Sequence, residues 1–213
     1  MSISDRKQKL TDVKKDAIVD GMEKALLSKS YEHLTIDDVA KEAEYSKKTI
    51  YSYFKSKDEI YLRLLLRKFD LLFAALKSAI TGSKESGIEK IKRLGESYYK
   101  FAQEYPEYMQ SIINYEANGT DECNENNKII ADFNTETEKS FLLLEEIIKE
   151  GIADGSISAE IDVVSTAILF WSNINGFVML TNKKGNYIRT NYGKPSDVLL
   201  ENNMNMLLRS LSP

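Results

Sequence analysis

The sequence predicts an all-α fold of about nine helices. Its 213 residues contain three prolines and ten glycines, so long stretches are free of helix breakers. Within those stretches apolar residues recur at i, i+3, i+4 and i+7, and strict alternation of β-branched and polar residues is absent. We therefore expect an N-terminal three-helix domain at residues 1–56 and a larger helical domain at residues 57–213.

The short helices of the N-terminal domain are predicted from their caps. Thr35, with Asp38 three residues later, is the N-cap of one helix, and Ser46 is the N-cap of the next. The charged residues 2–11 are expected to fray. The three helices are expected at residues 12–29, 36–43 and 47–54.

The C-terminal domain is predicted from six longer apolar-periodic segments. A capping box from Ser56 to Glu59 opens the first, and Pro106 separates two others. The segment 163–182 is almost uncharged, which predicts a helix buried on more than one side. The expected helices are residues 57–81, 88–104, 106–116, 125–150, 162–181 and 195–211.

Composition places the chain among ordinary globular proteins. Hydrophobic residues make up 42% of the chain and charged residues 29%. Cys123 is the only cysteine and His33 the only histidine, so neither an internal disulfide nor a Cys/His metal site is expected. The polar first ten residues are not a secretory signal, and we expect no membrane span. The expectation is a cytoplasmic protein without a cofactor.

Two short helices joined by a turn of three to four residues have the spacing of a DNA-binding helix-turn-helix. Residues 41–57 hold five lysines and two glutamates, a net charge of +3 (5 − 2), on a chain whose net charge is −4. A basic helix on an acidic protein is typical of phosphate binding. Its outward face carries Lys47, Lys48, Thr49, Tyr51, Ser52 and Tyr53.

Residues 45–60, Y-S-K-K-T-I-Y-S-Y-F-K-S-K-D-E-I, resemble the recognition helix and the start of helix 4 in the TetR family of transcriptional regulators. The resemblance extends from about Asp16 to Leu65. Family members usually carry glycine in the turn where this chain has Glu44. A left-handed conformation there costs a residue other than glycine about 1 kcal/mol.

A DNA-binding face is expected on the second short helix, because its donors can reach base edges or phosphates. Lys47 and Lys48 are expected to donate to guanine or to phosphate, and Thr49 and Tyr51 to reach base edges or a thymine methyl, with Ser52 on the same face. The resemblance implies phosphate contacts from Ser46, Tyr53 and Lys57, and the helix start at Thr35 can add another. The alternative for Tyr51 and Tyr53 is packing within the small domain.

A second set of candidates consists of aromatic and polar side chains on otherwise apolar segments. Pockets between bundle helices combine these residue types, although a plain core is the alternative. The resemblance implies a small apolar or aromatic effector, and Glu116 among aromatic rings would suit a cationic one. The candidate pocket residues are Phe73, Tyr98, Phe101, Tyr108, Ile112, Tyr115, Glu116, Phe133, Trp171 and Asn175.

These features predict a sequence-specific regulator that binds double-stranded operator DNA, a repressor released by an unidentified small-molecule effector. The resemblance implies a homodimer formed through residues 162–181 and 195–211. The alternative is a helical ligand-binding or protein-interaction module with non-specific DNA binding. An enzyme is not expected, because the chain has no glycine-rich phosphate loop, zinc-ligand spacing or G-x-S-x-G motif.

Overall fold

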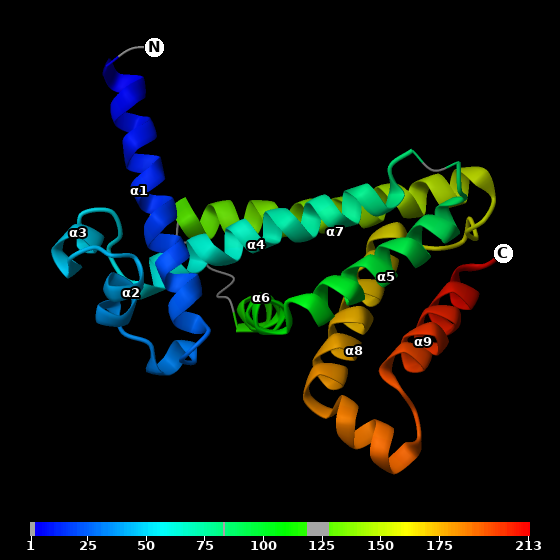
Figure 1. Cartoon of the computed structure of the whole chain (residues 1–213). Helices are drawn as coiled ribbons and strands as arrows, with labels where there is room; N and C mark the ends of the chain where they lie inside the picture. The colour runs from blue at the N-terminus through cyan, green and yellow to red at the C-terminus, as the bar shows by residue number, and fades with distance from the viewer. Residues whose placement is uncertain (1–2, 83, 119–127) are drawn as a thin grey trace. The chain divides into compact units, whose positions relative to one another are not determined.

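The computed structural model describes residues 3–82, 84–118 and 128–213, and gives only the backbone of residues 3, 114–118, 128–130 and 133. The described chain is all-α, as predicted, and contains no strand. Its helices are labelled in Figure 1. They are α1 (Ile3–Leu26), the short 3-10 helix η1 (Tyr31–His33), α2 (Ile36–Glu42), α3 (Lys47–Tyr51), α4 (Lys57–Ile80), α5 (Gly87–Glu104), α6 (Pro106–Asn118), α7 (Lys128–Asp154), α8 (Val163–Tyr192) and α9 (Ser196–Leu211).

The structure divides into two compact units. The described part of the N-terminal unit comprises residues 3–68 and 128–133, and that of the C-terminal unit comprises residues 69–82, 84–118 and 134–213. Helix α4 contributes to both. The domain boundary expected between residues 56 and 57 stays a prediction.

The N-terminal unit is built on the contact of α1 with α2, against which α3 packs (Figure 1). Ile18 and Met22 of α1 are fully buried, as are Val39 of α2 and Ile50 of α3. Gly21 allows the close approach of α1, because a Cβ there would lie 2.6 Å from the Cβ of Ala43. Burial of this apolar stripe, rather than the propensity of such short helices, holds the unit together.

The helix caps predicted for the N-terminal unit are confirmed. The Thr35 hydroxyl accepts a hydrogen bond from the Asp38 amide, and Asp38 accepts one from the Thr35 amide. The Ser46 and Ser56 hydroxyls accept hydrogen bonds from the amides of residues three positions later. Glu44 has a φ of 57°, so the turn between α2 and α3 is left-handed without a glycine.

Five of the predicted helix ends are wrong by three or more residues. Helix α1 ends at Leu26 instead of residue 29, and α7 continues to Asp154, past the expected residue 150. The expected frayed segment 2–11 is helical from Ile3, because Lys, Arg, Gln and Leu are good helix formers and no breaker interrupts them. Helix α3 ends at Tyr51 instead of residue 54. Helix α8 continues eleven residues past residue 181, to Tyr192, because its stop signal is the left-handed Gly193 rather than the polar composition before it.

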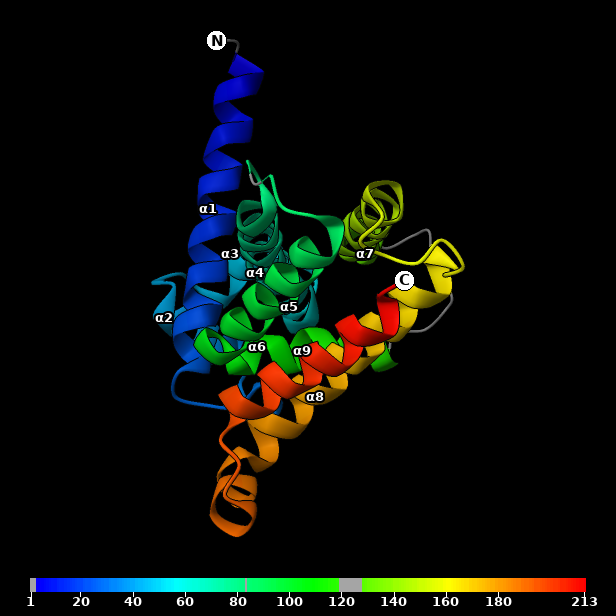
Figure 2. The ribbon, with the colours of Figure 1, turned by 90° about the vertical axis from the view of Figure 1, so that its right-hand side faces the viewer.

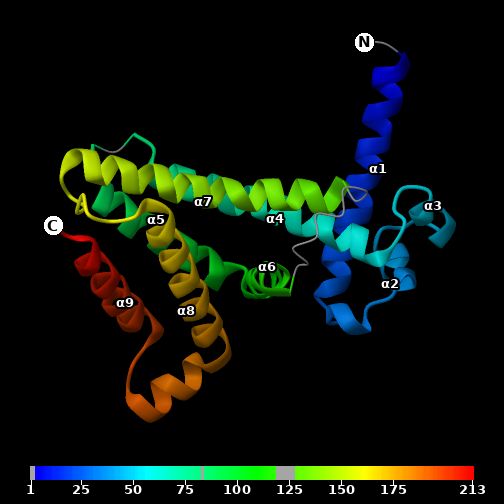
Figure 3. The same ribbon diagram turned by 180° about the vertical axis from the view of Figure 1, so that it is seen from behind.

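The C-terminal unit packs α5 against α6, α8 and α9, and α8 against α9. Figure 2 shows α8 and α9 side by side, and Figure 3 shows the chain returning from the end of α8 into α9. The amino end of α5 meets the carboxyl end of α7, where a Cβ on Gly87 would lie 2.3 Å from the Cα of Gly151. Asp154 of α7 accepts a hydrogen bond from the Gly87 amide, which satisfies an otherwise unpaired helix-start donor.

Helix α8 differs from its prediction in a second respect. Five of its residues are buried, Ala167, Phe170, Ile174, Val178 and Thr181. Its other sides expose large apolar side chains, including Val164, Ile168, Leu169 and Leu180. By length and composition α8 is also long and apolar enough to cross a membrane, which the sequence reading did not anticipate. One such helix is weak evidence for a membrane span, because core helices of soluble proteins share these properties.

Candidate nucleic-acid interface

Helix α3 presents a mostly polar surface and is held by one apolar anchor. Ile50 is its only buried residue and is 0% exposed. Ser46 fixes the start of the helix and also bonds the Thr49 hydroxyl at 2.9 Å. Because one residue of the short helix points inward, the others remain available to a ligand. Lys47, Lys48, Tyr51 and Ser52 are exposed, and Thr49 and Tyr53 are partly exposed.

The two lysines at the start of α3 have different surroundings. Lys47 forms an ion pair with Asp37 of α2 at 3.0 Å, and this hydrogen bond raises the pKa of Lys47. Lys48 forms no ion pair with any described residue. Lys48 can therefore donate to a base or phosphate without losing a protein partner. Lys47 must first give up its ion pair with the exposed carboxylate of Asp37. Asp37 beside the recognition face was not foreseen from the sequence.

Aromatic and hydroxyl groups at the end of α3 point in two directions. Tyr51 is 50% exposed, so its phenol is available to DNA. Tyr53 follows the helix, and the Lys14 ammonium of α1 lies 5.9 Å from its ring centroid. The Ser52 hydroxyl donates to the Thr49 carbonyl at 2.6 Å. The packing expected as the alternative role of Tyr53 is thus present in part, while Tyr51 remains outward.

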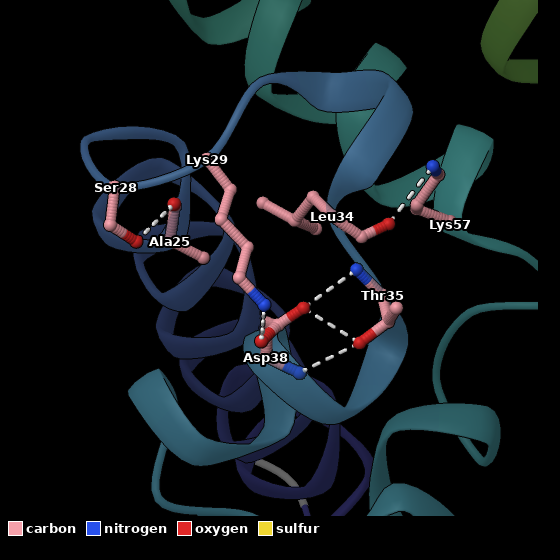
Figure 4. Close-up of polar contacts among 7 residues, drawn as sticks. All are labelled: Ala25, Ser28, Lys29, Leu34, Thr35, Asp38 and Lys57. Carbon is pink, nitrogen blue, oxygen red and sulfur yellow. Dashed lines mark hydrogen bonds and ion pairs between the residues drawn. The ribbon is translucent and has the colours of Figure 1, made fainter.

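Lys57 is held by the backbone of its own unit. Its ammonium donates to the carbonyls of Tyr31 and Leu34 at 2.8 and 3.0 Å and lies 4.2 Å from the centroid of the Tyr31 ring. The bond to Leu34 is drawn in Figure 4. Tyr31 also stacks on Tyr61 and donates to Asp58; its burial raises its pKa. Lys57 therefore already has an internal structural role, and its predicted phosphate contact stays a prediction.

The start of α2 is stabilised by a charged cluster, shown in Figure 4. Lys29 and Asp38 form an ion pair at 2.5 Å, and the Thr35 hydroxyl and amide also bond the same carboxylate. The Lys29 ammonium, followed by the Thr35 groups, holds the pKa of Asp38 well below its usual range. Thr35 remains exposed, so its predicted phosphate contact is sterically open.

All the predicted pocket residues but one lie on described helices of the C-terminal unit, and the exception, Phe133, belongs to the N-terminal unit. Tyr98 of α5 is 2% exposed, donates a hydrogen bond to Asn175 of α8 and packs edge-on against Trp171, with ring centroids 5.3 Å apart. Phe101 and Tyr108 each contact the ring of Tyr105. Ile112 is buried and Phe73 is partly exposed. The side chains of Tyr115, Glu116 and Phe133 lie outside the described residues.

The structure therefore brings three of the candidates together, Tyr98, Trp171 and Asn175, as a partly buried group in which Tyr98 donates to Asn175. Among the described residues no group of His, Cys, Asp and Glu side chains could hold a metal ion. What stands out chemically is the exposed, basic, hydroxyl-bearing surface of α3, which suits a polyanion.

Comparison with known proteins assigns the helices that carry this surface to a known family. The family described as "Bacterial regulatory proteins, tetR family" matches residues 18–64, from the second half of α1 to the start of α4. Residues 18–64 therefore form a helix-turn-helix domain of the TetR family. The matched residues include α2, the left-handed turn and α3, so the helix-turn-helix reading of these elements is confirmed.

One curated relative agrees with the family match at residues 18–64. An uncharacterized HTH-type transcriptional regulator from Haemophilus influenzae is 26% identical over 102 residues, which is 48% of this chain and 54% of that protein. The chain thus matches about half the length of that relative.

Two solved structures share the fold of the whole chain. A TetR/AcrR-family regulator from Thermobifida fusca superposes with a TM-score of 0.66 at 18% identity, covering 91% of this chain and 96% of that one. The regulator FadR from Bacillus subtilis, solved with stearoyl-CoA, gives 0.66 at 19% identity, covering 90% and 96%. At this identity the likeness establishes the fold alone.

Proposed function

We propose that this TetR-family protein is a homodimeric, cytoplasmic repressor that binds a specific operator and releases it when a small molecule binds the C-terminal unit. The observation that carries the proposal is the exposed face of α3, anchored only by Ile50 and presenting Lys48 and Tyr51 to solvent. A short basic helix of this kind fits the major groove, where lysine donates to guanine and phosphate.

Dimerisation is proposed from the exposed apolar surface of α8 and α9. Large apolar side chains at least two-fifths exposed are Val164, Ile168, Leu169 and Leu180 on α8 and Val198 and Met206 on α9. A contiguous apolar surface on two neighbouring helices favours burial against a second copy. Two copies would present two α3 helices to successive turns of DNA, about 34–36 Å apart.

The effector site is proposed at the aromatic group of α5 and α8. Opening the contact between Tyr98 and Asn175 would expose one polar point within apolar walls, the mixture typical of ligand pockets. Because FadR from Bacillus subtilis was solved with stearoyl-CoA, long-chain acyl-CoA is the first class of probe we would test. Coupling of about 1–3 kcal/mol would weaken operator binding roughly 5- to 150-fold.

The test is selection of bound DNA from a random pool, followed by affinity measurements on the selected duplex. Lys48→Ala and Tyr51→Ala should each weaken specific binding by about 1–3 kcal/mol at fixed salt. Lys24→Ala is the matched control, because Lys24 is an exposed lysine of α1 in the same unit. Unchanged operator affinity in both α3 variants would contradict the proposed recognition face.

A second candidate function is non-specific DNA binding by a helical ligand-binding or protein-interaction module. It is favoured by the engagement of Lys47 with Asp37 and of Lys57 with backbone carbonyls, which leaves fewer donors for bases. Failure of the selection to enrich any sequence, together with a steep salt dependence, would support this alternative over the repressor. A reporter gene under the selected operator distinguishes repression from activation.

A further inference from the structure

The amino-terminal half of α1 is basic and mostly exposed. Residues 5–15 contain five cations, Arg6, Lys7, Lys9, Lys14 and Lys15, and two acids, Asp5 and Asp12, a net charge of +3 (5 − 2). Residues 4–10 are all exposed. Figure 1 shows this part of α1 extending well past α2 and α3 of the same unit. An exposed basic helix that contributes nothing to the core is a candidate interaction surface.

The geometry places part of this basic surface beside the recognition helix. The Lys14 ammonium lies 5.9 Å from the ring centroid of Tyr53, and the Lys15 ammonium lies 5.8 Å from that of Phe54. Both rings belong to the segment that directly follows α3. Lys14 therefore stands at the same edge of the N-terminal unit as the proposed DNA-binding face.

Helical spacing extends this edge along α1. Lys7 precedes Lys14 by seven residues, so both side chains project from one side of the helix, about 10 Å apart along its axis. Neither lysine forms an ion pair with a described residue. Two unpaired ammonium groups in a row, continuous with α3, complement a line of phosphates better than the acidic remainder of the chain would.

We propose that the amino-terminal half of α1 is a second DNA-contacting element, in which Lys7 and Lys14 bind the phosphate backbone of the duplex held by α3. This inference rests on the proposed function. It assigns α1 a role in affinity rather than in sequence choice, because phosphate contacts position a protein without distinguishing bases.

The test is the salt dependence of duplex binding by Lys7→Gln with Lys14→Gln. Loss of two phosphate contacts should flatten the slope of log K against log salt by about 1.8 per bound protomer. If the two phosphate contacts contribute nothing at 1 M salt, this change in slope makes the variant bind about 60-fold more weakly than the wild type at 0.1 M salt, per protomer. The ratio of affinities for the selected and a scrambled duplex should stay unchanged.

Two further variants separate this role from overall charge. Lys7→Arg with Lys14→Arg keeps both cations and should keep the slope. Lys9→Gln with Lys24→Gln makes the same charge change at exposed positions outside the stripe, since Lys9 lies about 200° around the helix from Lys7 and Lys24 is in the last turn of α1. This control should bind as the wild type does.

The outcomes distinguish the inference from the function on which it rests. The proposed contact is overturned if the salt slope of the Lys7 and Lys14 variant is unchanged. It is also overturned if the Lys9 and Lys24 control flattens the slope equally. If the wild type prefers no sequence, the repressor proposal fails, yet the slope on the scrambled duplex still tests α1. Circular dichroism of each variant establishes that α1 remains helical, so a loss of slope is not a loss of structure.

Discussion

The two units of this protein are stabilised in different ways. In the N-terminal unit, short helices are fixed by local caps such as Thr35 and Ser46, and one buried side chain, Ile50, anchors α3. In the C-terminal unit, long helices meet across close backbone contacts such as Gly87 with Gly151, and hydrogen bonds join distant residues such as Tyr98 and Asn175. A unit specified by local signals is recognisable from its sequence, and the family match at residues 18–64 lies within it.

The largest expected effect is that of removing the anchor of α3. Ile50→Ala deletes three carbons from a fully buried site and should cost about 3 kcal/mol through lost burial and a cavity. Hydrogen exchange in α2 and α3 should accelerate and operator affinity should fall. The emission of Trp171, the single tryptophan and a residue of the C-terminal unit, should keep its urea midpoint. An equal shift of that midpoint would show that the two units unfold together.

Gly87→Ala is the corresponding test of the C-terminal unit. The added methyl would lie 2.3 Å from the Cα of Gly151, so α5 and α7 must separate, at a cost of about 2 kcal/mol. Urea unfolding followed by Trp171 emission measures the loss. Lys100→Ala is the control, because Lys100 is an exposed residue of α5 and alanine is at least as good a helix former as lysine. Equal losses in both variants would contradict the close contact.

Loss of a local cap should have a smaller effect. Thr35→Ala removes the hydroxyl that accepts from the Asp38 amide and should cost about 1 kcal/mol, as N-cap deletions do. Thermal unfolding of the N-terminal unit, monitored through hydrogen exchange of the α2 amides, measures this loss of stability. Thr35→Ser retains the hydroxyl and should recover most of the lost stability. A serine variant as unstable as the alanine variant would show that the Thr35 methyl group, and not the cap, matters.

The smallest effect concerns acid stability. The pKa of Asp38 is lower in the folded chain than its unfolded value of about 4, so its ion pair and hydrogen bonds stabilise the fold above that pH. This contribution is lost as the pH falls below about 4 toward the folded pKa. Asp38→Asn should therefore be less stable than the wild type at pH 7, and the difference should narrow in acid. Thermal melts between pH 2.5 and 7 test this, and a difference independent of pH would contradict it.

The helix caps and the left-handed turn show how far local sequence signals extend. Thr35, Ser46 and Ser56 marked helix starts correctly, because a cap needs only residues three positions apart. The start of α1 and the end of α8 were missed, because composition alone does not stop a helix that lacks a breaker. Gly193, with φ 64°, was the true stop signal of α8.

The candidate sites were less predictable than the fold. The exposure of Lys48 and Tyr51 follows from their positions on the helix relative to the buried Ile50, and both side chains are exposed in the structure. The pairing of Lys47 with Asp37, the capture of Lys57 by two carbonyls and the position of Lys14 beside Tyr53 all depend on how α1, α2 and α4 pack within the unit. No spacing rule predicts such contacts from the sequence, so they are seen only in the three-dimensional structure.

Glu44 offers a simple route to a more heat-resistant protein. At its φ of 57° a glutamate is disfavoured by about 1 kcal/mol relative to glycine. Glycine there would relieve this strain, although the greater flexibility of the denatured chain would offset part of the gain in stability. Because the Glu44 side chain is exposed and is not among the groups proposed to bind DNA, thermal tolerance can be tuned here without touching those groups.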